Sequence, residues 1–209
     1  MVNLKGGTLK TTGTAYLLSA FHEAGMNVLG VDADGENENL QDWQEDGPLP
    51  FPVIGKRGGN LDRELPGIIG DRYDVVGIDT PPMTAQRGTV ASAVRFSTHV
   101  LTPLAPTPMD HTRLFSVLEL MQEQGPASVH GRPPHHAALL VKCKASANSP
   151  KTYRTTITND GVHVLTAQIA DRERFAQAYG EPIRNAMSTE FGDVAMELLD
   201  LNTTVETSA

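Results

Sequence analysis

The residues best suited to chemistry in this 209-residue chain lie at its beginning. Residues 5–12 read Lys-Gly-Gly-Thr-Leu-Lys-Thr-Thr. Adjacent glycines let backbone N–H groups close around phosphate oxygens, a lysine adds positive charge, and a threonine hydroxyl can ligate Mg²⁺. The segment therefore predicts a loop that binds the phosphates of a nucleotide, and we call it the phosphate loop. It comprises Lys5, Gly6, Gly7, Thr8, Leu9, Lys10, Thr11 and Thr12.

Two leucines depart from the general phosphate-loop pattern G-x-x-x-x-G-K-[ST]. Leu4 stands at its first glycine and Leu9 at its second. A loop that turns its N–H groups toward an anion alternates right- and left-handed residues. If position 9 is left-handed, leucine costs about 1–2 kcal/mol there. Leu9 thus indicates either a strained functional loop or weakened nucleotide binding, and the sequence leaves both open.

Aspartates follow two short apolar runs further along the chain. Residues 28–31 lead into Asp32 and Asp34, and residues 73–78 lead into Asp79. Such runs are typical of buried parallel strands, and ligands bind beyond the carboxyl ends of those strands. We therefore expect the three carboxylates and the phosphate loop to converge on one edge of a sheet.

The elements that must position these residues can be read from hydrophobic spacing. Alternating strands and helices predict an α/β fold, a doubly wound and mostly parallel sheet with helices on both faces. We expect one domain over 1–209, a loop over 44–60 and a frayed tail over about 200–209. Strands are expected at 27–31, 73–78, 99–104 and 137–142, and helices at 11–24, 61–70, 110–124, 164–178 and 183–199.

Composition excludes several classes of protein. Hydrophobic residues make up 39% and charged residues 20% of the chain, as in an ordinary globular protein. No apolar stretch approaches the 18 residues of a membrane span, and no signal peptide opens the chain. The single cysteine, Cys143, excludes an intramolecular disulfide or a four-thiolate cluster within one chain and indicates a buried thiol in a reducing cytoplasm.

These motifs together resemble the ParA/MinD ATPases. Lys5, just before the glycines, matches their deviant Walker A box, K-G-G-x-G-K-T-T. Residues 28–36 are similar to the family's V-L-L-V-D-x-D-P-Q, and residues 73–82 to its Y-D-x-x-x-I-D-x-P-P. Residues 98–110 resemble the P-x-x-P-x-P-x-D stretch of the short, ParF-like branch. The resemblance implies a P-loop NTPase fold.

The resemblance also implies roles for individual residues. Lys10 would contact the β- and γ-phosphates of ATP, and Thr11 would ligate Mg²⁺. Asp79 would hold the same Mg²⁺, and Asp32 would support its water ligands. Asp34 would orient the attacking water. Lys5 would reach the phosphates bound by a partner chain, acting on developing charge like an arginine finger.

The function implied is that of a ParA-type partition ATPase in the cytoplasm, associated with the nucleoid. Such proteins dimerise on ATP, bind DNA without sequence preference, and hydrolyse ATP when stimulated by a ParB-type centromere-binding protein that carries a plasmid, prophage or similar cargo. The first alternative is a degenerate relative that binds ATP weakly or not at all and serves as an interaction module. A MinD-like membrane ATPase is less favoured, because residues 190–209 carry five acids and no base.

DNA binding would require a basic face. The net charge is −8, but residues 142–184 carry 7 Lys/Arg against 4 Asp/Glu. This is the only basic region, although it could equally be an ordinary solvated face. The candidate DNA contacts are Lys142, Lys144, Lys151, Arg154, Arg172, Arg174 and Arg184.

Overall fold

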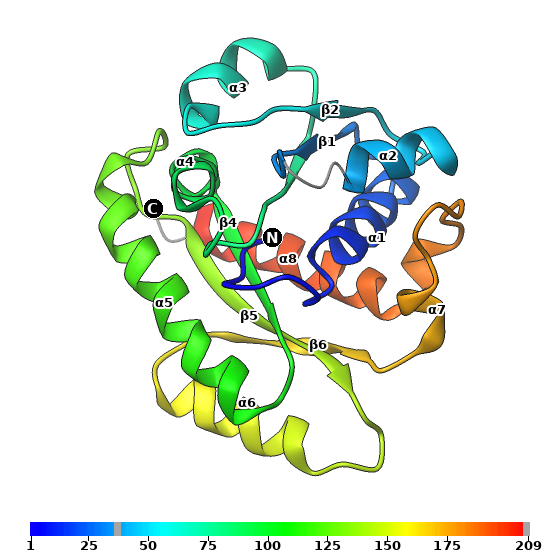
Figure 1. The fold of residues 1–209 in the computed structure, drawn as a ribbon, viewed down its shortest axis with the longest axis vertical. Helices are drawn as coiled ribbons and strands as arrows, with labels where there is room; N and C mark the ends of the chain where they lie inside the picture. The colour runs from blue at the N-terminus through cyan, green and yellow to red at the C-terminus, as the bar shows by residue number, and fades with distance from the viewer. Residues whose placement is uncertain (36–38, 207–209) are drawn as a thin grey trace.

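The computed structural model describes residues 1–35 and 39–206 as an α/β fold (Figure 1). Residues 36–38 lie outside the described residues, and they include Glu36, the last residue of the segment similar to the family's V-L-L-V-D-x-D-P-Q. The strands are β1 (Val28–Asp32), β2 (Val53–Gly55), β3 (Val75–Asp79), β4 (His99–Leu104), β5 (His135–Cys143) and β6 (Val164–Ala170). The helices are α1 (Lys10–Glu23), α2 (Asn39–Asp46), α3 (Leu61–Ile69), α4 (Arg87–Phe96), α5 (Pro108–Gln124), α6 (Ser149–Asn159), α7 (Glu173–Ala176) and α8 (Glu190–Glu206), with 3₁₀ turns at Gly125–Ala127 and Ala186–Ser188.

The strands form two parallel sheets, and the first residues of the chain lie between them. The orders are β2-β1-β3 and β4-β5-β6. The Met1 amine donates to the Ile78 carbonyl of β3 at 2.6 Å, and the Val2 N–H donates to the Leu101 carbonyl of β4 at 3.0 Å. Residues 1–4, although not assigned as a strand, therefore join the two sheets into one layer.

Helices cover both faces of this layer, as the sequence predicts. Strand β5 shows the alternation, because successive side chains of a strand point to opposite faces. Leu139 and Val141 pack in the core with α1 and α8, whereas Ala138 and Leu140 pack with α5 and α6. Helices α3 and α4 cover the second face beside β1 and β3. The predicted doubly wound architecture is confirmed.

The helix expected over 164–178 is wrong, because residues 164–170 form strand β6. Leu165 and Ile169 are fully buried and four residues apart, a spacing that fits one face of a helix or of a strand. The pairing of β6 with β5 decides between the two. The expected loop over 44–60 also contains strand β2, and the sequence analysis did not predict α4 or α6.

The end of the chain is more regular than expected. Residues 200–206, where we expected a frayed tail, belong to helix α8, and residues 207–209 lie outside the described residues. Within 1–35 and 39–206, no helix combines the length and the apolar character needed to cross a bilayer.

The contact that residues 1–4 make between the two sheets can be tested at Asn3. Its buried side-chain amide donates to the Pro103 carbonyl of β4. Asn3→Ala removes this donor, so we expect a loss of about 1–3 kcal/mol in the free energy of unfolding. Urea unfolding measures it. Asn60→Ala is the matched control, because Asn60 is exposed and its side chain makes no capping bond. Equal losses of unfolding free energy in the two variants would contradict a role of Asn3 in joining the sheets.

Candidate functional site

The phosphate loop enters helix α1 with alternating backbone handedness. Gly7 has φ 72°, and Leu9 has φ 60° and ψ 26°, both left-handed. The Gly13 N–H donates to the Leu9 carbonyl at 2.8 Å and closes the first turn. The first N–H groups of α1 have no partner within the helix, so they and the helix dipole favour an anion at this end. The left-handed conformation considered for position 9 is therefore present.

Lys10 places its amine against the inside of this loop. The residue is only 7% exposed, and its Nζ donates to the Lys5 carbonyl at 3.2 Å. Burial lowers the pKa of Lys10, while the charges of Asp79 and Asp34 oppose that shift. Lys10, Asp79 and Asp34, which the sequence predicts at one site, are thus close enough to interact.

Asp79 and Thr11 provide oxygen atoms at the start of α1. Asp79 is 1% exposed, and its Oδ1 has no hydrogen-bond partner among the described residues. Burial raises the pKa of Asp79 to about 6, against the opposing effects of a hydrogen bond from Thr11 and the charges of the Met1 amine and Lys10. A carboxylate oxygen without a partner beside a threonine hydroxyl suits Mg²⁺, which prefers oxygen ligands. The residues present therefore fit the metal that the family resemblance implies.

Asp32 has a structural contact that its sequence position did not reveal. Its Oδ1 accepts the Asp34 N–H at 3.0 Å, and its Oδ2 accepts the N–H groups of Leu40 and Gln41 at 2.9 and 3.0 Å. Burial raises the pKa of Asp32, and these backbone bonds oppose the shift. Asp32 thus holds the first turn of α2 against the end of β1. Its support of metal-bound water stays a prediction.

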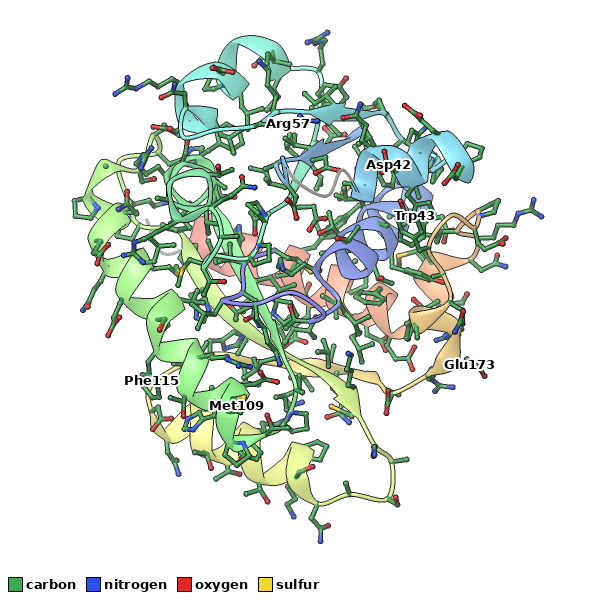
Figure 2. The ribbon with its side chains drawn as sticks, viewed as in Figure 1. Asp42, Trp43, Arg57, Met109, Phe115 and Glu173 are labelled. Carbon is green, nitrogen blue, oxygen red and sulfur yellow. The ribbon has the colours of Figure 1, made fainter. Side chains whose placement is uncertain are left out.

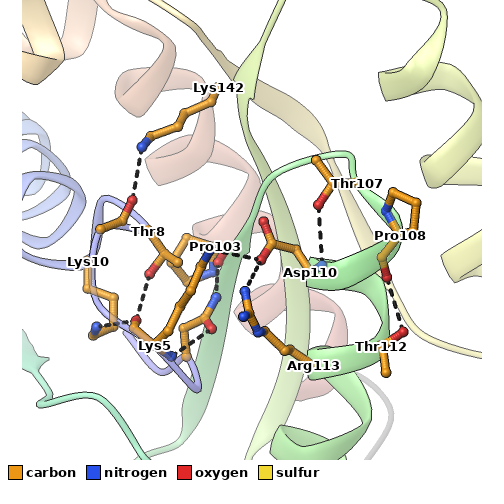
Figure 3. A network of polar contacts seen from close by, with 12 residues as sticks. Lys5, Thr8, Lys10, Pro103, Thr107, Pro108, Asp110, Thr112, Arg113 and Lys142 are labelled. Carbon is orange, nitrogen blue, oxygen red and sulfur yellow. Dashed lines mark hydrogen bonds and ion pairs between the residues drawn. The ribbon is translucent and has the colours of Figure 1, made fainter.

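Lys5 lies at the rim of the loop rather than inside it. Its side chain is 44% exposed, and its Nζ is 3.6 Å from Oδ1 of Asp110 at the start of α5. Arg113 donates to the same oxygen at 3.1 Å, so Asp110 holds two cations (Figure 3). Among the described residues, the side-chain amine of Lys5 is therefore held by a partly exposed ion pair, which is a weak restraint.

The seven candidate DNA contacts do not form one free basic face. Arg154 donates to the Leu165 and Thr166 carbonyls of β6, and Arg172 and Arg174 both pair with Glu190. Lys142 donates to the carbonyl of Gly7 in the phosphate loop. The remaining three are exposed: Lys144, Lys151 and Arg184.

Sequence reasoning missed two residues of the site. Asp110 was noted only as the end of a motif, yet it is 7% exposed and holds Lys5. Lys142 was named as one of seven candidate DNA contacts, and its amine donates to the Gly7 carbonyl of the phosphate loop. The position of Asp110 shortly after strand β4 could have suggested that it pairs with a lysine of the phosphate loop. No local signal marks Lys142.

Comparison with known proteins finds a matching family and several solved structures with a similar fold. The family model described as CobQ/CobB/MinD/ParA nucleotide binding domain matches residues 1–183. Comparison with curated proteins finds no match. Several solved structures share the fold.

Apo McdA of Cyanothece has a TM-score of 0.70 at 17% identity, over 94% of this chain and 97% of that one. The MinD cell division protein of Aquifex aeolicus has a TM-score of 0.70 at 16% identity, over 95% and 94%. A putative plasmid partition protein of Borrelia burgdorferi bound to AMPPNP has a TM-score of 0.68 at 15% identity, over 95% and 96%. At such low identity these likenesses show the fold alone.

The strain at Leu9 gives a test of the loop conformation. Leu9→Gly and Leu9→Ala remove the same side-chain packing, but only glycine relieves a left-handed residue. We therefore expect Leu9→Gly to be more stable than Leu9→Ala by about 1 kcal/mol in urea unfolding. At Leu4, which is not among the left-handed residues, the alanine variant should be more stable than the glycine variant. Alanine being favoured at both positions would contradict the assigned loop geometry.

Burial of Asp79 predicts a pH-dependent stability. Its pKa of about 6 exceeds the value of 3.8 expected in the unfolded chain, so its contribution is full below pH 4 and is lost as pH rises through 6. Asp79→Asn lacks this loss, so its stability relative to the wild type should increase between pH 4 and 7. Urea unfolding at several pH values measures it. Asp71→Asn, which removes an exposed carboxylate, is the control for the loss of one negative charge, and a flat difference for Asp79→Asn would refute the expectation.

Proposed function

Since the chain belongs to the CobQ/CobB/MinD/ParA nucleotide-binding family, we propose that it is a ParA-type ATPase that binds ATP with Mg²⁺ and hydrolyses it. The observation that carries the proposal is the group formed by the buried Lys10 and Asp79 and the half-buried Thr11 at the start of α1. Among the described residues, Oδ1 of Asp79 has no hydrogen-bond partner, and Nζ of Lys10 donates to the Lys5 carbonyl. A polyphosphate with Mg²⁺ would supply the missing opposite charges and oxygen ligands.

Each residue of the phosphate loop then has a defined task. The N–H groups of residues 6–12 would line the phosphates, and Lys10 would turn its amine from the Lys5 carbonyl to the β- and γ-phosphate oxygens. Thr11 and Asp79 would hold Mg²⁺, which neutralises charge developing on the phosphates. Asp34 would orient the attacking water from the end of β1.

Dimerisation on ATP is the second part of the proposal. Lys5 is partly exposed at the loop rim, so it can leave Asp110 and reach the phosphates bound by a second copy. Helix α5 also presents the exposed side chains of Met109 and Phe115 (Figure 2). Met109 adjoins Asp110 in sequence, which puts apolar surface beside the residue that holds Lys5.

Partition of DNA or a similar cargo is the third part. Lys144, Lys151 and Arg184 are exposed and would contact DNA without sequence preference. Three cations on a chain of net charge −8 favour weak binding by the monomer, so the dimer, which doubles them, would be the DNA-binding form. A ParB-type centromere-binding protein would stimulate hydrolysis, and the protein would act in the cytoplasm on the nucleoid.

A degenerate relative that binds nucleotide poorly is the competing function. The left-handed leucine at position 9 favours it, because strain in the loop lowers the stability of the binding-competent form. The two functions differ in whether ATP changes the oligomeric state.

The test is sedimentation velocity of the full chain with and without ATP and Mg²⁺, then with duplex DNA. We expect an ATP-dependent dimer and a further shift with DNA. Lys10→Ala should abolish ATP binding and both shifts, because it removes the buried amine of the loop. Lys56→Ala is the control, since Lys56 lies on the surface paired with Glu64. An unchanged monomer in every mixture would select the degenerate function.

A further inference from the structure

Strand β5 contains an irregularity directly before its end. Leu140 pairs with Gln168 of β6 and Cys143 pairs with Ala170, so the two strands advance by different numbers of residues over the same length. This count is that of a β-bulge, with one extra residue on β5. Bulges redirect side chains and are frequent beside active sites.

Lys142 is the residue that the bulge redirects. It has φ 55°, one of three left-handed non-glycine residues in the described chain. In a regular strand, Lys142 would share the face of Ala138 and Leu140. Instead Cys143 packs with those two residues in the core beside α5 and α6. The side chain of Lys142 is thereby freed to turn toward the phosphate loop.

The amine of Lys142 contacts a peptide that forms the phosphate loop. Its Nζ donates to the Gly7 carbonyl at 2.9 Å across 135 positions of sequence (Figure 3). A trans peptide is planar, with its C=O and N–H pointing in opposite directions. Holding the Gly7 carbonyl therefore directs the Thr8 N–H away from Lys142.

Two lysines thus fix two carbonyls of the same loop. Lys10 holds the carbonyl of Lys5 from the inside, and Lys142 holds that of Gly7 from β5. No atom lies within 4 Å of a Cβ built on Gly7, so packing on the Gly7 side does not restrain this peptide, whereas Thr8 on its other side is buried. Glycine has more backbone freedom than any other residue, and a charged hydrogen bond to its carbonyl is a way to hold it.

We propose that Lys142 is a positioning residue of the nucleotide site, which locks the Gly7–Thr8 peptide so that the loop N–H groups face the phosphates. The proposal rests on ATP binding as proposed above. It removes Lys142 from the DNA-binding face. It also explains why Lys142 keeps a strained, left-handed conformation at the end of β5, because such strain is typically retained at functional sites.

The test is calorimetric titration of ATP and of ADP, both with Mg²⁺, into Lys142 variants of the full chain. Lys142→Met keeps the aliphatic stem but loses the donor, so both nucleotides should bind about five- to tenfold more weakly, since the loop holds phosphates that both share. Lys142→Arg keeps a charged donor and should restore most of the affinity. Lys56→Met is the control and should bind as the wild type does, because Lys56 pairs with Glu64 on the surface.

Lys142→Gly separates positioning from folding. Glycine relieves the left-handed residue, so thermal stability of the nucleotide-free protein should be equal to or above that of the wild type, while affinity should fall as in Lys142→Met. Unchanged affinity in Lys142→Met would overturn the positioning role. A loss confined to ATP would also overturn it, because it would indicate contact with the γ-phosphate.

The outcome for the wild type distinguishes the two proposals. If the wild type binds ATP and Lys10→Ala does not, the proposed nucleotide site is supported, whatever the result for the Lys142 variants. If the wild type itself binds neither ATP nor ADP, the proposed function fails, and the role of Lys142 fails with it.

Discussion

The structure depends on the short segment of residues 1–4 that lies between β3 and β4. Its backbone bonds to both half-sheets and the side chain of Asn3 bonds to β4, so among the described residues this segment makes the layer continuous. The phosphate loop begins at the next residue. Asp79 at the end of β3 and Asp110 after β4 therefore lie on either side of the loop, and the same bonds that close the sheet bring the site together.

The nucleotide site contains two ionisable side chains that are buried. Lys10 and Asp79 are both almost inaccessible, and burial shifts the pKa of each toward its neutral form. Their mutual attraction opposes this without cancelling it. Such a group is costly in a protein unless its charges are completed by a partner. That cost, together with the strain at Leu9, is the physical sign that this end of α1 is built for a ligand.

Four of the seven basic residues between 142 and 184 make intramolecular bonds: Lys142, Arg154, Arg172 and Arg174. Strand β6 lies at the edge of the sheet, and an edge strand exposes unpaired backbone groups. Arg154 covers its carbonyls, while Glu197 of α8 accepts the N–H groups of Thr166 and Ala167 at 2.6 and 3.0 Å. Part of the positive charge between residues 142 and 184 is thus taken up by intramolecular bonds, which composition alone does not show.

The phosphate loop, the aspartates at the strand ends and the α/β class could be predicted from the sequence, because they follow from local spacing and from the rule that parallel strands share one carboxyl edge. The same spacing wrongly predicted a helix where β6 lies, since Leu165 and Ile169 fit a helix as well as a strand. The bonds from Asp32 to the start of α2 and from Lys142 to Gly7 became visible in the folded chain alone. The reason is physical: backbone handedness within a bulge and hydrogen bonds across a hundred residues depend on neighbours that local sequence does not contain.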